Sequence, residues 1–210
     1  PSIRPRVSLV SAYHLKLLLY ETVTAGDLPG SGRCSSSILC EGYAMAGSFA
    51  EDLRSAGHQI TMVAGKKDAL PSTWFGDSTV EFVRTDGQPR DALRRALRHC
   101  DAAYVIAPES GGMLAELTGI VEELRGSQSS LNVPSATIRR VSHKPVVYAS
   151  LAAAGVNVPR TLVLKDMTVQ EALHACSTLG LPLVLKPADG TGSEGLSVAF
   201  SEDDLHETLG

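Results

Sequence analysis

The sequence predicts an α/β protein in which a parallel sheet with helices on both faces is followed by a smaller α+β part. Over residues 1–126, short apolar runs of strand length alternate with segments whose apolar residues recur at helical spacing. This alternation is typical of a doubly wound parallel sheet with right-handed crossovers. A segment rich in Gly, Ser, Asn and Pro at 126–140 joins it to a second part that ends in a glycine-rich loop. We therefore expect two domains, 1–126 and 127–210.

The elements of the first domain follow from apolar periodicity and from helix-stop signals. Residues 15–20 form an uninterrupted apolar run suited to a buried parallel strand. The long helix that follows is expected to stop at Gly57, because glycine is favoured just past helix ends. The predicted order after the first strand is helix 37–56, strand 59–63, strand 80–83, helix 89–99, strand 102–107 and helix 111–125.

Polar residues follow two of these strands at their carboxyl ends, where ligands bind in open α/β sheets. Glu21, Thr24 and Gly26 come after the first strand, and Glu109 and Ser110 come after the fourth. The position of these residues is also consistent with ordinary turns whose carboxylates are solvated. A further acid, Glu41, is expected near the start of the long helix, where it could simply complement the helix dipole.

The second domain carries its signals in a compact order. Lys144 and Pro145 begin a predicted helix, since proline is tolerated in the first turn. Thr168 and Glu171 are spaced as a capping box at the start of another helix. The expected elements are helix 144–155, strand 160–164, helix 168–179, a strand from 183 to 186, an apolar run at 196–200 and a helix beginning at 201.

The stretch from 183 to 197 is the most informative in the chain. A strand ends at Lys186 and opens into a loop that holds three glycines, with Thr191 and Ser193 adding hydroxyl groups. Glycines let backbone N–H groups approach a ligand, and successive N–H groups form a concavity suited to phosphate. The loop lacks the Gly-Lys-Ser/Thr of a Walker motif and the following helix of a dinucleotide fingerprint. A plain hairpin turn is the alternative.

The order Lys–helix–Gly-Val-x-Val-Pro–strand–helix–Leu-Gly-Leu-Pro–strand–Lys-Pro–glycine loop resembles the first half of the ATP-grasp nucleotide-binding fold over residues 141–209. The resemblance implies a Rossmann-like pre-ATP-grasp domain followed by the first α+β lobe of an ATP-grasp fold. One departure is His143, where the family often has Asp. The implied ATP-binding residues are Lys144, Lys186, Asp189, Gly190, Thr191, Gly192, Ser193, Glu194 and Gly195, the last seven forming a flap over the phosphates.

Motifs in the first domain resemble the tyramine–glutamate ligase group of ATP-grasp enzymes, which act in methanofuran or methylofuran biosynthesis. They are Glu21-Thr-Val-Thr-Ala-Gly, Glu41-Gly-Tyr-Ala-Met, Ala107-Pro-Glu, Leu114-x-x-Leu-Thr and Val121-Glu-Glu. The resemblance implies an ATP- and Mg²⁺-dependent carboxylate–amine ligase that works through an acylphosphate. The substrate-binding candidates it implies are Glu21, Thr24, Gly26, Glu41, Glu109 and Ser110.

The second lobe of an ATP-grasp enzyme usually supplies acidic Mg²⁺ ligands, and we expect that lobe to be absent from this chain. Glu202, Asp203 and Asp204 are acidic, but with Ser201 they are typical of a helix N-cap and first turn. We therefore expect no metal ligands here and a chain that is inactive or incomplete by itself.

Composition excludes several other classes. A net charge of −4 and 5% aromatic residues argue against nucleic-acid binding. The four cysteines show no metal-site or disulfide spacing, and no signal-peptide or membrane-span pattern is evident. We expect a cytoplasmic protein that can form a homodimer, with a small carboxylate and amine as partners. Two alternatives stay open: a non-catalytic nucleotide-binding protein, and an ATP-grasp ligase of another amino acid or peptide. A Rossmann-type oxidoreductase is disfavoured, because no Gly-x-Gly-x-x-Gly motif follows the first predicted strand.

Overall fold

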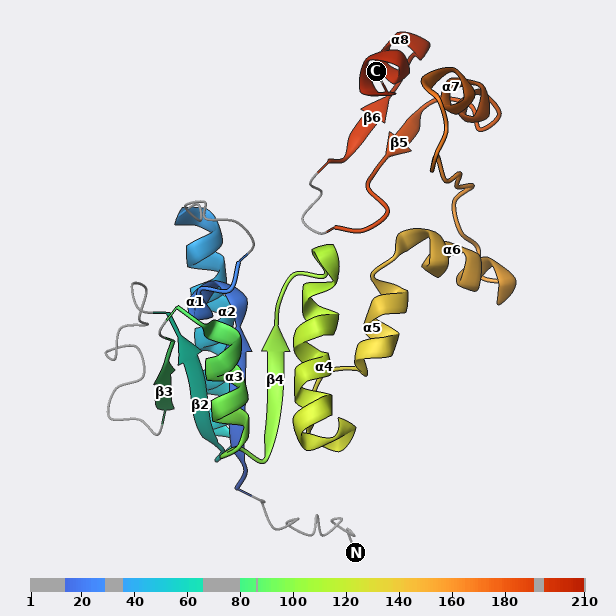
Figure 1. Cartoon of the computed structure of the whole chain (residues 1–210). Helices are drawn as coiled ribbons and strands as arrows, with labels where there is room; N and C mark the ends of the chain where they lie inside the picture. Colours follow the sequence, from blue (N-terminus) through green and yellow to red (C-terminus); the bar gives the residue numbers. More distant parts are fainter. Residues whose placement is uncertain (1–13, 29–35, 66–79, 86, 191–194, 210) are drawn as a thin grey trace, which may run out of the picture. The chain divides into compact units, whose positions relative to one another are not determined.

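The computed structural model describes residues 14–28, 36–65, 80–85, 87–190 and 195–209 (Figure 1). Its contacts form two compact units. Unit 1 combines residues up to Ala107 with Glu116–Pro134, and unit 2 combines Pro108–Ala115 with the residues from Ser135 onward. The predicted domain limits of 1–126 and 127–210 remain a prediction.

Unit 1 is built on a four-stranded, wholly parallel sheet with strand order β3-β2-β1-β4. In this register Leu17 of the central strand lies opposite Ile60 on one side and Ala102 on the other. The parallel sheet predicted from the alternating pattern is confirmed. The strands are β1 (Lys16–Glu21), β2 (Gln59–Ala64), β3 (Val80–Arg84) and β4 (Ala102–Ile106).

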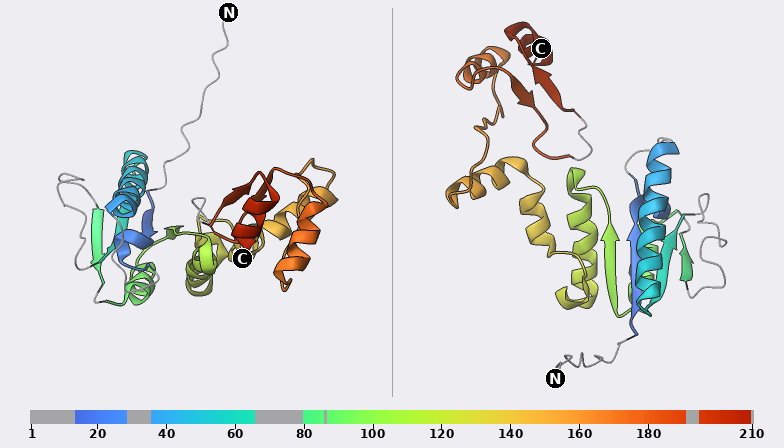
Figure 2. Two further views of the ribbon diagram at one scale, coloured as in Figure 1. Left: turned by 90° about the horizontal axis from the view of Figure 1, so that it is seen from above. Right: turned by 180° about the vertical axis from the view of Figure 1, so that it is seen from behind.

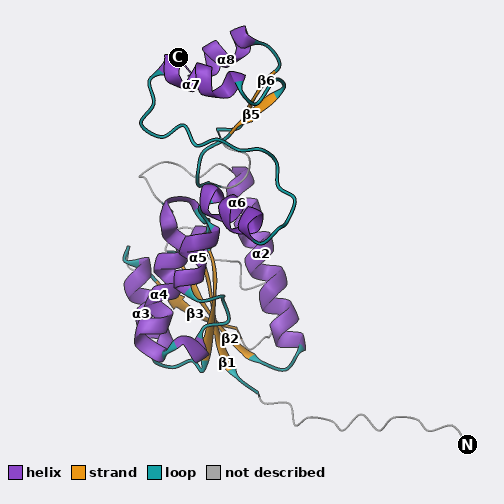
Figure 3. Cartoon of the chain, turned by 90° about the vertical axis from the view of Figure 1, so that its right-hand side faces the viewer, coloured by secondary structure: helices purple, strands orange, loops and turns teal. Residues whose placement is uncertain are grey.

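Helices cover both faces of this sheet. The long helix α2 (Ser36–Ser55) and the helix α3 (Pro89–Leu97) lie on opposite sides of it (Figure 2). Through Ala46 and Ala50, α2 packs against the apolar side chains of β1 and β2. Figure 3 shows α4 (Met113–Arg125) on the same side of the sheet as α3. The alternating sequence therefore folds as a doubly wound layer structure.

Unit 2 contains a short antiparallel hairpin of β5 (Leu183–Leu185) and β6 (Ser197–Ala199), with Val184 opposite Val198. The helices α7 (Val169–Ser177) and α8 (Glu202–Leu209) lie against it, and their small core contains Cys176, Ala199 and Leu205. Two further helices, α5 (Ser135–Val141) and α6 (Lys144–Ala153), precede them. Among the described residues, no helix has the length and apolar character needed to cross a membrane.

Two segments differ from the expectations. Residues 160–164, predicted as a strand, form none: this short stretch pairs with no described strand, and Leu162 and Val163 are 40% and 49% exposed. The joining segment 126–140 contains the helix α5, which we did not predict, and is anchored by Ile138 at 2% exposure. Its Asn132 side chain hydrogen-bonds both backbone groups of Val105 and so protects an edge of the sheet.

The predicted capping box of α7 is confirmed. The Glu171 backbone N–H donates to Thr168 Oγ1 at 3.3 Å, and the Thr168 N–H donates to Glu171 Oε2 at 2.8 Å. The Thr168 backbone N–H and hydroxyl both donate to the Glu171 carboxylate and lower its pKa. This stabilisation is therefore present above the unfolded-state pKa and is lost as the pH falls through the lower folded-state pKa.

Replacing Thr168 by alanine removes the cap acceptor, and we expect it to lower the free energy of unfolding by about 1 kcal/mol at neutral pH. Thermal unfolding measures the loss. Thr161→Ala, in an exposed segment outside any helix or strand, is the matched control and should change stability by less than about 0.5 kcal/mol. Equal melting temperatures for the two variants would show that the cap is unimportant.

Candidate functional site

Lys144 is the first residue of α6 and ties this helix to the segment that follows β5. Its backbone N–H donates to the carbonyl oxygen of Ala188 at 2.8 Å. Its ammonium Nζ donates to the carbonyl oxygen of Gly190 at 2.9 Å. Pro145 occupies the first turn, as expected, and needs no backbone partner there. The helix start is therefore fastened to the glycine loop at two points.

Lys186 directly follows β5, one residue outside the strand that was predicted to end at it. Its Nζ donates to the hydroxyl oxygen of Tyr148 at 2.6 Å and lies 5.0 Å from the centroid of the same ring. Tyr148 stands one helical turn after Lys144 on α6. The two predicted lysines are thus both attached to the interface between α6 and the loop after β5.

The described part of the glycine loop has the backbone that its composition predicted. Gly190 and Gly195 have φ values of 110° and 69°, in the region that favours glycine. A Cβ at Gly195 would also lie 2.9 Å from Pro187 Cγ. Asp189 accepts a hydrogen bond from the Gly111 N–H at 3.4 Å within unit 2. The remaining predicted residues, Thr191, Gly192, Ser193 and Glu194, lie outside the described residues.

The chemistry of this cluster fits the phosphates of a nucleotide. Among the described residues, Lys144 and Lys186 form no ion pair; each ammonium contacts a neutral oxygen instead. No carboxylate of a described residue therefore pairs with either ammonium. Ammonium groups beside a glycine-rich backbone are the groups that stabilise phosphate oxygens in nucleotide sites.

The turn after β1 is a buried, capped helix turn rather than an open loop. Glu21 is 1% exposed; its two carboxylate oxygens accept from the N–H groups of Val23 and Thr24 at 2.8 and 2.7 Å. Thr24 is fully buried and donates its hydroxyl to the Glu21 carbonyl, and Gly26 ends α1 (Thr22–Ala25) with φ 75°. The geometry gives these residues a structural role, and substrate binding by them remains a prediction.

The other predicted substrate residues lie in different units. Glu41 is exposed on α2 in unit 1. Glu109 and Ser110 are half-buried at the turn that leads through η2 (Ser110–Gly112) into α4, and their contacts place them in unit 2. The turn that contains Glu109 and Ser110 is thus linked, through Gly111, to Asp189 of the glycine loop.

A polar network in unit 1 was not predicted. The buried Tyr20 hydroxyl donates to Asp27 Oδ2 at 2.7 Å, and Arg90 Nε donates to the same oxygen at 3.3 Å. Arg90 also pairs with Glu116. Burial, reinforced by the hydrogen bond to Asp27, raises the pKa of Tyr20. No local pattern predicts this network, because Arg90 lies 63 residues from Asp27 in the sequence.

The acidic start of α8 is a helix cap, as predicted. Asp204 Oδ2 accepts from the N–H groups of Phe200 and Ser201 at 2.9 and 3.0 Å, and Ser201 Oγ accepts from the Asp204 N–H at 3.1 Å. These bonds lower the pKa of Asp204, and the bond from the Phe200 N–H contributes most. In the part of the chain that the structure describes, no three His, Cys, Asp or Glu side chains gather as a metal site would require.

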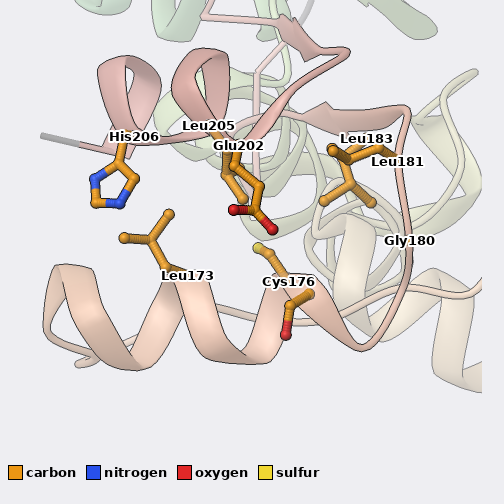
Figure 4. A pocket seen from close by; sticks show the side chains of 9 residues that line it. Leu173, Cys176, Gly180, Leu181, Leu183, Glu202, Leu205 and His206 are labelled. Carbon is orange, nitrogen blue, oxygen red and sulfur yellow. The ribbon is translucent and has the colours of Figure 1, made fainter.

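Among the described residues, each unit contains a cavity. Figure 4 shows the cavity of unit 2, of about 280 Å³, between α7 and α8, where Leu173 and Cys176 of α7 face Glu202, Leu205 and His206 of α8. Burial raises the pKa of its Cys176 thiol. Another, of about 340 Å³, lies in unit 1 and is lined by residues that include Lys16, Thr61 and Glu81. Neither cavity is lined by a predicted site residue.

Two family models match consecutive parts of the chain. One, described as the pre ATP-grasp 3 domain, matches residues 60–138. The other, described as the carbamoyl-phosphate synthase L chain, ATP binding domain, matches residues 144–210. The second match contains both predicted lysines and the whole glycine loop.

Two curated proteins are similar in sequence. The carbamoyl phosphate synthase large chain of Thermotoga neapolitana is 26% identical over 166 residues, which cover 75% of this chain and 14% of that protein. The formate-dependent phosphoribosylglycinamide formyltransferase of Oleidesulfovibrio alaskensis is 29% identical over 156 residues, covering 67% of this chain and 38% of that protein. The chain thus spans less than half the length of these relatives.

Solved structures share the fold at lower identity. Biotin carboxylase from Campylobacter jejuni, in a complex described as β-γ-ATP, has a TM-score of 0.60 at 20% identity over 93% of this chain and 40% of that chain. Carboxyaminoimidazole ribonucleotide synthase from Aspergillus clavatus, complexed with ATP, has a TM-score of 0.59 at 18% identity over 93% and 44%. The α/β prediction, with a Rossmann-like domain before an ATP-grasp lobe, is confirmed. The descriptions of the two family models agree with a pre-ATP-grasp domain over residues 60–138 and an ATP-binding domain over residues 144–210.

Proposed function

We propose that this chain is part of an ATP-dependent ligase that joins a carboxylate to an amine through an acylphosphate. The observation that carries the proposal is the pair of lysines, Lys144 and Lys186, both fastened beside the glycine loop without a carboxylate partner among the described residues. The match to an ATP binding domain over residues 144–210 supports the same assignment.

In this proposal the two ammonium groups and the loop N–H groups offset the negative charge of the ATP phosphates. A carboxylate oxygen of the acid attacks the γ-phosphorus, and the bond from that phosphorus to the bridging oxygen of ADP breaks. The amine nitrogen then attacks the acyl carbon, phosphate leaves with its oxygen, and the extra amine proton passes to solvent. Such chemistry depends on positioning and charge stabilisation, so it needs no nucleophilic side chain.

For the substrates we propose glutamate as the acid and an amine such as tyramine, in the biosynthesis of a methanofuran- or methylofuran-type cofactor. The proposal rests on the first-domain motifs around Glu21, Glu41 and Glu109. Of these residues, Glu109 belongs to the same compact unit as the glycine loop and is half-buried, so it and Ser110 are the stronger candidates. We place the protein in the cytoplasm as a homodimer.

Mg²⁺ is proposed as the partner of ATP, as in other phosphoryl transfers. The described residues of this chain offer no cluster of three acidic, histidine or cysteine side chains to hold it. We therefore assign its ligands to no residue described here.

The test is phosphate release from Mg-ATP by the full-length protein, with glutamate, with tyramine, with both, and with panels of other acids and amines. We expect release only when an acid and an amine are present together. Release with a different pair would change the substrates and keep the ligase. Nucleotide binding without release for any pair would replace the ligase with a non-catalytic nucleotide-binding protein.

A further inference from the structure

We infer that Tyr148 is a positioning residue that holds the Lys186 ammonium ready for the nucleotide phosphates. The inference rests on the proposed function, because it assigns a role within the same site. One contact carries it: Lys186 Nζ donates to the hydroxyl oxygen of Tyr148 at 2.6 Å, at the hydroxyl end of the ring, whose centroid lies 5.0 Å from that atom.

The place of Tyr148 in the fold suits this role. It lies on α6 one helical turn after Lys144, the residue whose ammonium holds the Gly190 carbonyl. Tyr148 is half-buried, whereas Lys186 is exposed just beyond a three-residue strand. The helix thus presents, on neighbouring turns, one contact that fixes the loop and one that fixes the second lysine.

A tyrosine can hold this lysine without cancelling its charge. The phenol oxygen accepts one of the three ammonium N–H bonds and leaves two for a ligand. A carboxylate in the same place would neutralise the ammonium and compete with phosphate, whereas the neutral hydroxyl keeps the full positive charge available.

Holding the lysine before the ligand arrives raises affinity. A lysine side chain at the surface samples many rotamers and loses this freedom when it binds. A partner that restricts it in the free protein lowers that cost, which is the general advantage of preorganisation. Removing the hydroxyl should therefore weaken nucleotide binding through Lys186 and should leave the fold unchanged.

The experiment is isothermal titration calorimetry of the full-length protein with Mg-ATP, for wild type, Tyr148→Phe, Lys186→Ala and the double variant. We expect Tyr148→Phe to weaken binding by about five-fold. In the Lys186→Ala background the same change should have no further effect, because the lysine through which it acts is gone. Tyr104→Phe, whose ring packs on Phe49 in unit 1, is the matched control and should bind as wild type does. Melting temperatures of all variants check that the fold is intact.

The outcomes separate this inference from the proposed function. If the wild type binds no Mg-ATP, both fail together. If the wild type binds, Lys186→Ala weakens binding and Tyr148→Phe binds as wild type does, only the inference is overturned. An equal loss from Tyr148→Phe with and without Lys186 would likewise overturn it, since Tyr148 would then act by another route.

Discussion

Replacing Lys186 by alanine is expected to lower acid- and amine-dependent phosphate release from Mg-ATP by about 100-fold or more. A single preorganised donor to developing negative charge contributes about that much to a rate. Among the described residues, the Lys186 ammonium has a phenol rather than a carboxylate as its partner, so its charge is available to the phosphates. Steady-state kinetics with saturating acid and amine measure the loss.

The matched control for this variant is Lys165→Ala. The Lys165 side chain is 81% exposed, and its Nζ lies 3.9 Å from Asp166 Oδ2, on a side chain that is 85% exposed. Lys165→Ala changes the net charge of the protein by the same amount as Lys186→Ala does. Because salt screens the effect of an exposed charge outside the site, phosphate release should stay within about two-fold of wild type. Similar rates for Lys186→Ala and Lys165→Ala would contradict the assignment of Lys186 to the nucleotide site.

Replacing Glu21 by alanine is expected to lower the free energy of unfolding by about 3 kcal/mol. The change deletes both carboxylate oxygens and leaves the N–H groups of Val23 and Thr24 buried without acceptors. For a protein of this size the melting temperature should fall by about 6–12 °C. Differential scanning calorimetry, with urea denaturation as a second probe, measures it.

Two further variants sharpen this test. Glu123→Ala, on the exposed side of α4, should change stability by less than about 0.5 kcal/mol. Glu21→Gln keeps one acceptor oxygen but turns an NH₂ group toward one of the two N–H donors, so we expect an intermediate loss. A stable Glu21→Ala variant that nevertheless loses substrate affinity would show that Glu21 binds ligand rather than capping α1.

Features encoded by neighbouring residues were predictable from the sequence. The capping box of Thr168 and Glu171 joins residues three apart, and the structure contains it. The helices and strands of the parallel sheet agree with the predicted limits to within two residues, because periodicity and glycine stops act over one or two helical turns. The positive φ of Gly190 follows from the same local logic.

Features that depend on distant partners were not predictable. Residues 160–164 have the apolar composition of a strand, but a strand needs a neighbour with which to share hydrogen bonds. In the described part of unit 2, β5 and β6 pair with each other and not with this segment. Glu21 lies at the carboxyl end of the first strand, as predicted, but its side chain caps the helix α1. Composition alone cannot separate a paired strand from an unpaired apolar segment, or a ligand-binding carboxylate from a helix cap.

The site itself divides in the same way. Lys144 and Lys186 were predicted from the order of signals along the chain, whereas Tyr148 was not, because its contact with Lys186 forms only when α6 meets the segment after β5. Its spacing of one helical turn from Lys144 is the signal that could have found it. The network of Tyr20, Asp27 and Arg90 has no comparable spacing.

The most direct test of the proposed ligase follows one oxygen atom. The full-length protein is incubated with Mg-ATP, the amine, and the acid labelled with ¹⁸O in the reacting carboxylate, and the released phosphate is analysed by mass spectrometry. An acylphosphate transfers one carboxylate oxygen to phosphorus, so we predict one ¹⁸O atom in each phosphate released. Amide formation that leaves the phosphate unlabelled, or that places the label in AMP, would contradict an acylphosphate and with it the mechanism proposed for this chain.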